Sequence, residues 1–376
     1  MNDFLQRAEP PRSDEDFMRA ALALARRGLG RTAENPAVGA LVVRDGAIVA
    51  QGWTQEGGRP HAERVALDAA GALARGSTMY VTLEPCSHHG RTPPCADAIV
   101  AAGVSRVVSA IEDPDARVAG RGHAILRDGG VEVTTNVCAD EALRANLGHV
   151  LRVKEGRPMV TLKLAETLDG YAAGDEHDPR LSITSAPANA RTHVLRAMHD
   201  AIMIGIGTAK ADDPLMTVRA PGMEDRKPLR VVLDARLALS PRSRLAASAR
   251  ETPTLVLAGA AADSDCAKDL RATGVEIAPV ALDALGRIDL KAALAALAAR
   301  NITRVFSEGG PRIGAVLVAE GLADEVALFT APKPQGRGVP ALGEAARNIL
   351  RDPSRYALVE DAMLGADRIR RYERVF

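Results

Sequence analysis

The segments HAERVALDAAG (61–71) and EPCSHHGRTPPC (84–95) decide how the first part of this chain is organised. The first segment has the apolar spacing of a helix. STMYVTL (77–83) follows it and is typical of a strand, because β-branched and aromatic residues favour strands. CADAIVAAG (95–103) predicts a second helix that ends at Gly103. A helix, a strand and a helix in succession indicate a layered α/β sheet.

The flanking sequence extends this pattern in both directions. Ser13 and Asp16 have the spacing of a capping box and predict a helix start. AVGALVVRDGAIVAQG (37–52) predicts a hairpin whose tight turn is Asp45-Gly46. Downstream, the strands SRVVSAI (105–111) and VEVTTNV (131–137) enclose a short helix. The first region therefore reads as one α/β/α unit.

Length and composition limit the classes of protein. At roughly 150 residues per domain, the 376 residues predict two domains. Equal numbers of basic and acidic residues, 48 of each, argue against a nucleic-acid or membrane partner. Four cysteines are too few for a disulfide scaffold, and there is no apolar run of signal-peptide or membrane-spanning length. We therefore expect a soluble cytoplasmic protein.

The pattern restarts near GHVLRVKEGRP (148–158), so we expect domains at 1–150 and 151–376. DLKAALAALAAR (289–300) is an Ala-rich helix candidate in the second domain. Strand candidates alternate with helices there and predict a second α/β domain. They are MVTLKLAETLDG (159–170), DAIMIGIG (200–207), LRVVLDA (229–235), TLVLAG (254–259), VEIAPV (275–280), TRVFSEGG (303–310) and EVALFTA (325–331).

The two opening segments also contain a candidate metal site. His61, Cys86 and Cys95 offer one nitrogen and two thiolate ligands. A catalytic zinc takes three protein ligands and keeps one position open, where it lowers the pKa of bound water toward neutrality. Glu63 can carry the proton of that water to the ring and to the departing ammonia. His-x-Glu followed by Pro-Cys and a second Cys is the signature of zinc-dependent deaminases.

One feature departs from that signature. Eight residues, SHHGRTPP, separate Cys86 from Cys95, where the common signature has two. A loop must therefore return Cys95 to the metal, at the start of the next helix. Two other interpretations stay open: a structural zinc site with His88 or His89 as fourth ligand, and two ordinary buried cysteines.

The motifs NPAVGALVV, HAE and above all EPCSHHGRTPPC resemble the bifunctional deaminase/reductases of riboflavin biosynthesis. The resemblance covers nearly the whole chain. It implies deamination of a 2,5-diamino-6-ribosylamino-4(3H)-pyrimidinone 5′-phosphate, then reduction of the ribosyl chain to ribityl with NADPH. It also implies the fold class: a cytidine-deaminase-like α/β/α domain, followed by an α/β domain similar to dihydrofolate reductase.

In the first domain the resemblance implies that Asn35, His88 and Arg91 bind the substrate. EDPDARVAGRG (112–122) resembles the family's phosphate-side loop, although Asp115-Ala116 stands where an Asn-Pro is usual. The arginines of this loop, Arg117 and Arg121, can neutralise a phosphate or can be solvated.

The second domain lacks a complete dinucleotide-binding fingerprint. GIGTAK (205–210) has no third glycine. VFSEGGPRIGAVLV (305–318) instead runs from a strand through Gly309 and Gly310 into a helix that begins near Pro311. The N–H groups at such a helix start can bind a phosphate.

The resemblance strengthens this interpretation through LKLAETLDG (162–170), ADDPLMTVR (211–219) and SEGGPRIGAVL (307–317). It implies substrate contacts at Lys163, Arg180, Arg196, Met216, Arg219 and Glu308. It implies NADPH contacts at Ala165, Ser182, Thr208, Asp212, Gly310, Pro311, Arg312, Ile313, Gly314, Ala315 and Val316. Ser182 replaces an aromatic residue common in the family. Whether Lys163 or Glu308 assists proton transfer stays open.

Two alternatives to this function remain. One is a zinc-dependent deaminase of another nucleobase with a non-catalytic nucleotide-binding second domain. The other is a protein whose second domain only regulates. The expected cofactors are Zn²⁺ and NADPH, and the expected partners are a small phosphorylated pyrimidine and further copies of the chain.

Overall fold

The computed structural model describes residues 12–88, 93–116, 118–175, 181–259 and 264–376. The chain folds into two compact units, Met1–Glu155 and Gly156–Phe376. The first unit ends with helix α6 (Leu147–Glu155), inside the segment 148–158 where the sequence pattern restarts.

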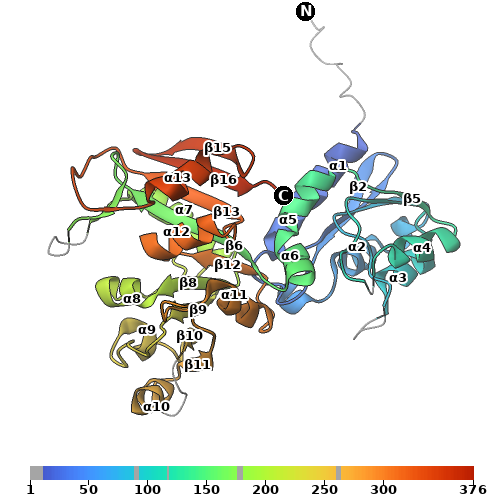
Figure 1. Ribbon diagram of the computed structural model, residues 1–376. Helices are drawn as coiled ribbons and strands as arrows, with labels where there is room; N and C mark the ends of the chain where they lie inside the picture. Colours follow the sequence, from blue (N-terminus) through green and yellow to red (C-terminus); the bar gives the residue numbers. More distant parts are fainter. Residues whose placement is uncertain (1–11, 89–92, 117, 176–180, 260–263) are drawn as a thin grey trace, which may run out of the picture. The chain divides into compact units, whose positions relative to one another are not determined.

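The first unit is a five-stranded sheet with helices on both faces (Figure 1). The sheet order is β2-β1-β3-β4-β5; β1 is antiparallel to both neighbours, and β3, β4 and β5 are parallel. The expected capping box and the hairpin turn with positive φ at Asp45 and Gly46 are confirmed. The elements besides α6 are α1 (Asp14–Ala25), β1 (Gly39–Arg44), β2 (Ala47–Trp53), α2 (Ala62–Ala70), β3 (Thr78–Val81), α3 (Cys95–Ala102), β4 (Arg106–Ser109), α4 (Arg121–Asp128), β5 (Glu132–Thr134) and α5 (Ala139–Ala145).

Alternation along the strands of this unit builds two cores. On β1, Val42 faces the helices α2, α3 and α4, whereas Leu41 faces α1 and α5. On β3, Met79 and Tyr80 divide in the same way. Since successive side chains on a strand point to opposite faces, one short strand supplies both cores. The sheet is therefore buried on both sides. The helices that pack on it include α2 and α3, whose N-termini lie at the candidate metal site.

The second unit contains a nine-stranded mixed sheet of order β11-β10-β9-β8-β12-β6-β13-β16-β15. The first seven strands in that order are parallel, and the C-terminal strands are antiparallel. Its elements are β6 (Met159–Glu166), β7 (Tyr171–Ala173), α7 (Ala186–Ala197), β8 (Ala201–Gly205), α8 (Ile206–Asp212), β9 (Leu229–Leu233), α9 (Arg244–Ala247), β10 (Thr254–Ala258), α10 (Asp265–Ala272), β11 (Glu276–Pro279), α11 (Leu290–Ala298), β12 (Arg304–Ser307), α12 (Pro311–Ala319), β13 (Glu325–Thr330), β14 (Val339–Pro340), α13 (Glu344–Arg351), β15 (Tyr356–Leu364) and β16 (Asp367–Arg374).

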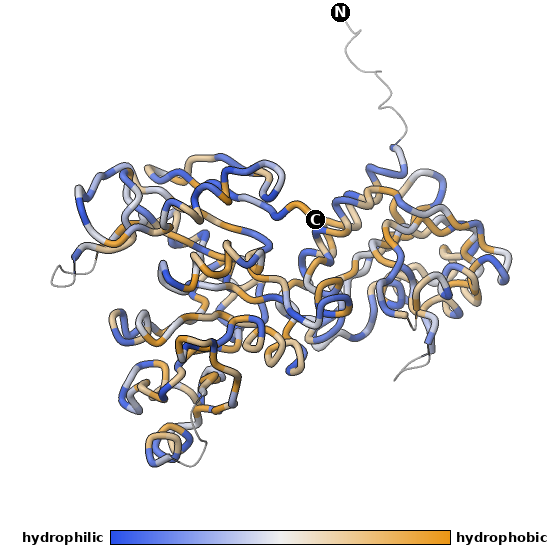
Figure 2. Tube along the Cα trace, in the orientation of Figure 1, coloured by the Kyte–Doolittle hydropathy of each residue, from blue (hydrophilic) through white to orange (hydrophobic). Residues whose placement is uncertain are grey.

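Helices also cover both faces of this sheet. Val305 of β12 packs with α11, α12 and α13, whereas Phe306 packs with α7, α9 and α10. Figure 2 shows the apolar stretches of the strands running through the interior of the unit. All seven strands expected from the sequence of this domain are present. The carboxyl ends of β6, β8 and β12 lie beside one another, because these strands are neighbours and parallel. Ligand sites of open α/β sheets lie at such ends.

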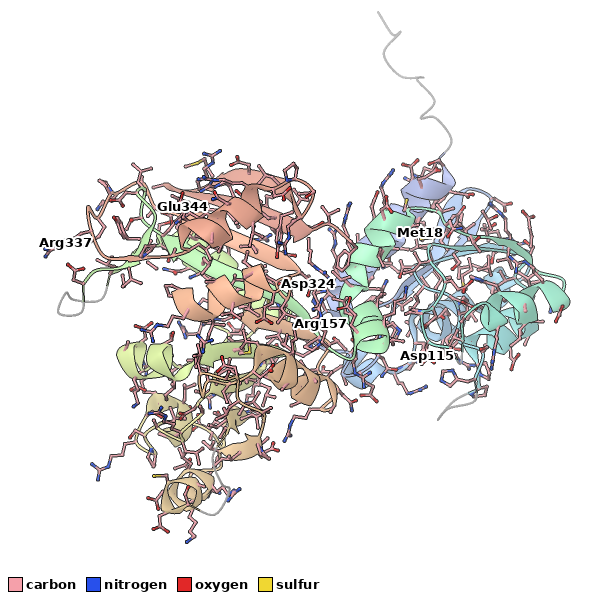
Figure 3. The ribbon with its side chains drawn as sticks, viewed as in Figure 1. Met18, Asp115, Arg157, Asp324, Arg337 and Glu344 are labelled. Carbon is pink, nitrogen blue, oxygen red and sulfur yellow. The ribbon has the colours of Figure 1, made fainter. Side chains whose placement is uncertain are left out.

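A buried ion-pair cluster joins distant parts of the second unit. Arg157 donates two hydrogen bonds to the carboxylate of Asp324, at 2.7 and 2.8 Å (Figure 3). Arg374 donates a third, at 3.2 Å, and the amide of Val160 a fourth, at 2.9 Å. The start of the unit, the residue before β13 and the last strand therefore meet at one carboxylate.

Within the described part of the chain, no helix combines the length and the apolar character that a membrane crossing needs.

Candidate active sites

Two helix N-termini and the loop after β3 bring the three proposed metal ligands together. His61 is the N-cap of α2, and Cys95 is the first residue of α3, as the sequence predicted. His61 Nδ1 lies 3.6 Å from Cys86 Sγ and 3.4 Å from Cys95 Sγ. The Cys95 amide donates to Cys86 Sγ at 3.3 Å. All three ligand atoms lie within 4.8 Å of one another.

The donor set fits zinc. One imidazole nitrogen and two sulfur atoms are ligands that zinc prefers, and the positive ends of two helices favour thiolates. Hydrogen bonds from Cys95 and His61 lower the pKa of Cys86 to about 4, so its thiolate forms readily. Hydrogen bonding to Cys86 and burial raise the pKa of Cys95. Among the described residues no fourth ligand joins the cluster, and His89 lies outside them.

Glu63 lies in the first turn of α2 and is only 4% exposed. Burial raises the pKa of its carboxyl to about 7, and the side chain hydrogen-bonds to Cys95. A carboxyl that titrates near neutral pH can both accept and return a proton. The geometry therefore suits a proton carrier at the edge of the metal cluster.

The other residues expected in this site differ in how they are held. Asn35 packs over Gly58, where an added Cβ would lie 2.1 Å from Asn35 Nδ2. His88 has a buried Nδ1 that makes no hydrogen bond within the described part of the chain. Such an unsatisfied atom suits a group that awaits a ligand. Arg91, like Arg117, lies outside the described residues.

Sequence reasoning missed the role of Glu84. Its side chain is fully buried and accepts hydrogen bonds from the amides of Asp113, Gly120, Gly122 and His123, at 2.8 to 3.2 Å. The motif EPC contains this residue, but its partners lie 29 to 39 residues downstream. No local spacing signals such a contact.

The second site centres on an ion pair after strand β12. Arg196 Nε lies 2.5 Å from Glu308 Oε1, and Arg196 Nη2 lies 2.9 Å from Glu308 Oε2. Burial raises the pKa of Glu308, but the charge and hydrogen bonds of Arg196, assisted by Lys163, outweigh it and lower the pKa overall. Lys163 Nζ lies 5.7 Å from the ring centroid of Phe329. Three expected substrate residues thus come together.

A cationic cluster continues from this pair. Burial and the charges of Arg196 and Arg244 lower the pKa of Arg219. The Arg219 amide donates to His193 Nδ1 at 3.2 Å. Burial and the nearby arginines also lower the pKa of His193, which sequence reasoning missed because one histidine on a helix gives no spacing signal. This excess of positive charge suits a phosphate.

Helices α8 and α12 begin side by side at the expected cofactor loop. Gly310 is the N-cap of α12, and a Cβ there would lie 3.3 Å from Thr208 Oγ1. A Cβ on Gly205 would lie 2.7 Å from Ile313 Cδ1. Only small residues allow this close approach, and no side chain caps the start of α12. The amides there can therefore bind an anion, which fits the pyrophosphate of NADPH.

The remaining expected reductase residues lie in varied surroundings. Met216 is 2% exposed and packs in the core on the sheet face that α7, α9 and α10 cover, with a backbone φ of 50°. Ser182 and Arg312 are exposed, and Ala165 follows Lys163 on the same face of β6. Asp212 ends α8, and Gly314 faces Leu162 and Leu164. Pro311, Ala315 and Val316 are half-buried. Arg180 lies outside the described residues.

Known proteins match the sequences of both units. Residues 11–111 match the cytidine and deoxycytidylate deaminase zinc-binding region, and residues 158–361 match the RibD C-terminal domain. The riboflavin biosynthesis protein RibD of Aquifex aeolicus is 40% identical over 326 residues, covering 87% of this chain and 89% of that protein. Its counterpart from Escherichia coli is 38% identical over 331 residues, covering 85% and 88%.

The chain belongs to the RibD family of bifunctional deaminase/reductases. Among solved structures, Acinetobacter baumannii RibD has a TM-score of 0.84 at 34% identity, over 96% of this chain and 99% of that one. A deaminase/reductase from Thermotoga maritima has a TM-score of 0.82 at 32% identity, with the same coverage. Membership confirms the expected fold class, a zinc-dependent deaminase domain and an NADPH-dependent reductase domain.

Proposed function

We propose that Met1–Glu155 is the deaminase and Gly156–Phe376 the reductase of one riboflavin-pathway enzyme. The proposed substrate is the diaminohydroxyphosphoribosylaminopyrimidine named for the Thermotoga relative, and the deaminated intermediate is the corresponding 5-amino-6-(5-phosphoribosylamino)uracil. Reduction then converts ribosyl to ribityl. The observation that carries this proposal is the convergence of His61, Cys86 and Cys95 beside the buried Glu63.

In the deaminase, His61 Nδ1 and the two cysteine sulfurs would hold the zinc. When bound, zinc would supply a water of lowered pKa. The Glu63 carboxylate would carry two protons in turn, one to the ring nitrogen and one to the leaving amine, for which a pKa near 7 is suited. Asn35, His88 and Arg91 bind the pyrimidine.

In the reductase, Arg196 and Arg219 bind the substrate, and their net positive charge supports a contact with its phosphate. NADPH supplies the hydride for the first carbon of the sugar. Glu308 stays ionised in its pair with Arg196 and therefore has no proton to donate. We assign the role of proton donor to Lys163. Since the Met216 side chain is buried, only its backbone is left for a substrate contact.

The cofactor contacts follow the two helix starts. The proposal places NADPH against the segment Gly310–Val316. The amides of Arg312 and Ile313, in the first turn of α12, would bind the pyrophosphate, with Thr208 and Asp212 beside them. Ala165 and Ser182 complete the proposed set. The open N-terminus of α12 supports this assignment, because a helix start with a glycine cap accepts anionic groups.

We also propose a cytoplasmic homo-oligomer. Cys138 and Cys266, the two cysteines outside the proposed zinc site, form no disulfide, and Cys266 is exposed, which supports a reducing compartment. The edge strand β15 exposes Leu358 (51%) and Met363 (62%), and an apolar sheet edge favours pairing with another copy. Light scattering of the wild type and of the Leu358→Lys/Met363→Lys variant tests the assembly; equal masses at monomer size for both would contradict it.

The test of the proposed function is one coupled assay on metal-analysed protein. The diaminopyrimidine phosphate and NADPH are supplied together, and ammonia and NADPH absorbance are followed in the same sample. We expect ammonia first, NADPH consumption second and about one zinc per chain.

Each other result has a definite meaning. Ammonia without NADPH consumption, even when the deaminated intermediate is supplied, would leave a deaminase with a nucleotide-binding second domain. Zinc-loaded protein that releases no ammonia would mean that the substrate is a different amine.

A further inference from the structure

Glu84 connects the metal site to a separate loop of the first unit. Its Oε1 accepts from the amides of Gly122 (2.8 Å) and His123 (3.2 Å). Its Oε2 accepts from Gly120 (2.9 Å) and Asp113 (3.2 Å). The residue itself lies two positions before the ligand Cys86. One carboxylate therefore holds both ends of the segment 113–123.

This contact places a negative charge at the start of α4. Gly120 is the N-cap of that helix, with φ of 79°, and Gly122 and His123 belong to its first turn. Free amides at a helix start attract anions, and here the chain supplies its own. The amides that an incoming phosphate would use at α4 are thus already bonded to Glu84.

The loop also packs on the backbone next to the metal. A Cβ on Gly122 would lie 2.0 Å from the carbonyl oxygen of Pro85, so only glycine fits there. The Glu84 amide donates to the carbonyl of Ile111 at 3.0 Å. A shift of the Glu84 carboxylate is therefore expected to move the loop relative to Cys86, because Gly122 packs directly on the Pro85 backbone.

We propose that Glu84 is a positioning residue of the deaminase: it fixes the segment 113–123 against the Pro85-Cys86 backbone and so sets where that loop meets the substrate. This proposal rests on the proposed function of the first unit. It follows that a phosphate at this loop would be bound by side chains and not by the start of α4, whose amides Glu84 already occupies. Arg121 is one exposed side chain of the loop, and it forms no ion pair within the described part of the chain.

The test uses the full-length, zinc-loaded enzyme and the variant Glu84→Gln. Whichever way the new amide turns, its NH₂ group faces two of the four N–H donors, so two hydrogen bonds are lost. Asp128→Asn is the matched control, because Asp128 is an exposed acid at the other end of α4 that accepts none of these four bonds. Zinc content, both activities and amide hydrogen exchange are measured for each protein.

We expect Glu84→Gln to raise the deaminase KM about tenfold, with a smaller change in kcat, because hydrogen bonds to a charged group are lost. Zinc content and reduction of the supplied deaminated intermediate should be unchanged. Hydrogen exchange should accelerate at the amides of 113 and 120, or of 122 and 123. Asp128→Asn should match the wild type in every measurement.

Several results would overturn the proposal. Unchanged KM and exchange in Glu84→Gln, or loss of zinc with KM unaltered, would each do so. If Glu84→Gln does not fold, Glu84→Asp, which keeps the charge but withdraws it, should show the same changes at smaller size. In the wild type itself, fast exchange at all four amides would refute the contact. A wild type that releases no ammonia would refute the proposed function, and the exchange data would then judge Glu84 separately.

Discussion

The two sites of this chain are assembled over different distances in sequence. In the first unit, His61 and Cys95 are 34 residues apart, and both lie at the starts of local helices. In the second unit, Arg196 and Glu308 are 112 residues apart and come together through the sheet. A motif of short range can be read from the sequence, whereas a long-range ion pair becomes visible only when the strand order is known.

The largest effect is expected at the metal site of the first unit. Glu63→Gln keeps the shape of the side chain but cannot carry a proton. Ammonia release should fall by about 10²- to 10⁴-fold, with zinc and reductase activity unchanged. Steady-state assays of both activities check this. Asp68→Asn, an exposed acid on the same helix, is the control. Deamination by Glu63→Gln at nearly the wild-type rate would remove Glu63 from the mechanism.

The next prediction removes one partner of the ion pair in the second unit. Glu308→Ala leaves Arg196 without its carboxylate, and losing one partner of a buried charge pair costs about 2 kcal/mol or more. The reductase kcat/KM should therefore fall roughly 30-fold, with deamination unaffected. Kinetics with the deaminated intermediate provide the measurement. An equal loss of both activities would contradict the division of labour between the two units.

A smaller effect is expected at the cofactor loop. Gly310→Ala would place a Cβ 3.3 Å from Thr208 Oγ1, which intrudes on the start of α12. The KM for NADPH should rise about threefold to tenfold, because one helix-terminus contact is weakened. Gly207→Ala is the control, since a Cβ there meets nothing within 4 Å. If both variants bind NADPH as the wild type does, the cofactor lies elsewhere.

The smallest effect concerns acid stability. The folded-state pKa of Glu308 lies below its ordinary value, so its pairing stabilises the fold above the unfolded-state pKa, about 4.3. That contribution is lost as the pH falls through the lower folded-state pKa. Urea unfolding at pH 3 and pH 7 should show a smaller difference for Glu308→Gln than for the wild type. An identical pH dependence would mean that the pair adds no stability.

Much of the fold follows from local patterns, and the omissions have physical causes. The hairpin at Asp45-Gly46 and the start of α3 at Cys95 were predicted from turn chemistry and motif spacing. The strands β15 and β16 were not predicted. β15 is exposed along most of its length, so it lacks the apolar alternation that marks a half-buried strand.

The site residues also fall into those that the sequence predicts and those that it does not. His61, Glu63 and the cysteines could be predicted because zinc chemistry requires particular residue types at short spacing. The pairing of Arg196 with Glu308 was not predicted, and neither was the contact of Glu84 with four backbone amides. Every residue except proline has a backbone N–H group. The sequence therefore does not show which amides a buried carboxylate will bind.

The carboxylate of Asp324 has a consequence for how the chain folds during synthesis. It binds Arg157 at the beginning of the second unit and Arg374 on its strand β16. The first unit can complete its core before the second is synthesised, since domains fold as units from the N-terminus. The second unit cannot close until β16 has left the ribosome, and we expect protease resistance of ribosome-stalled chains to appear there only with that strand. A nascent chain therefore holds a finished deaminase fold before its reductase fold can close.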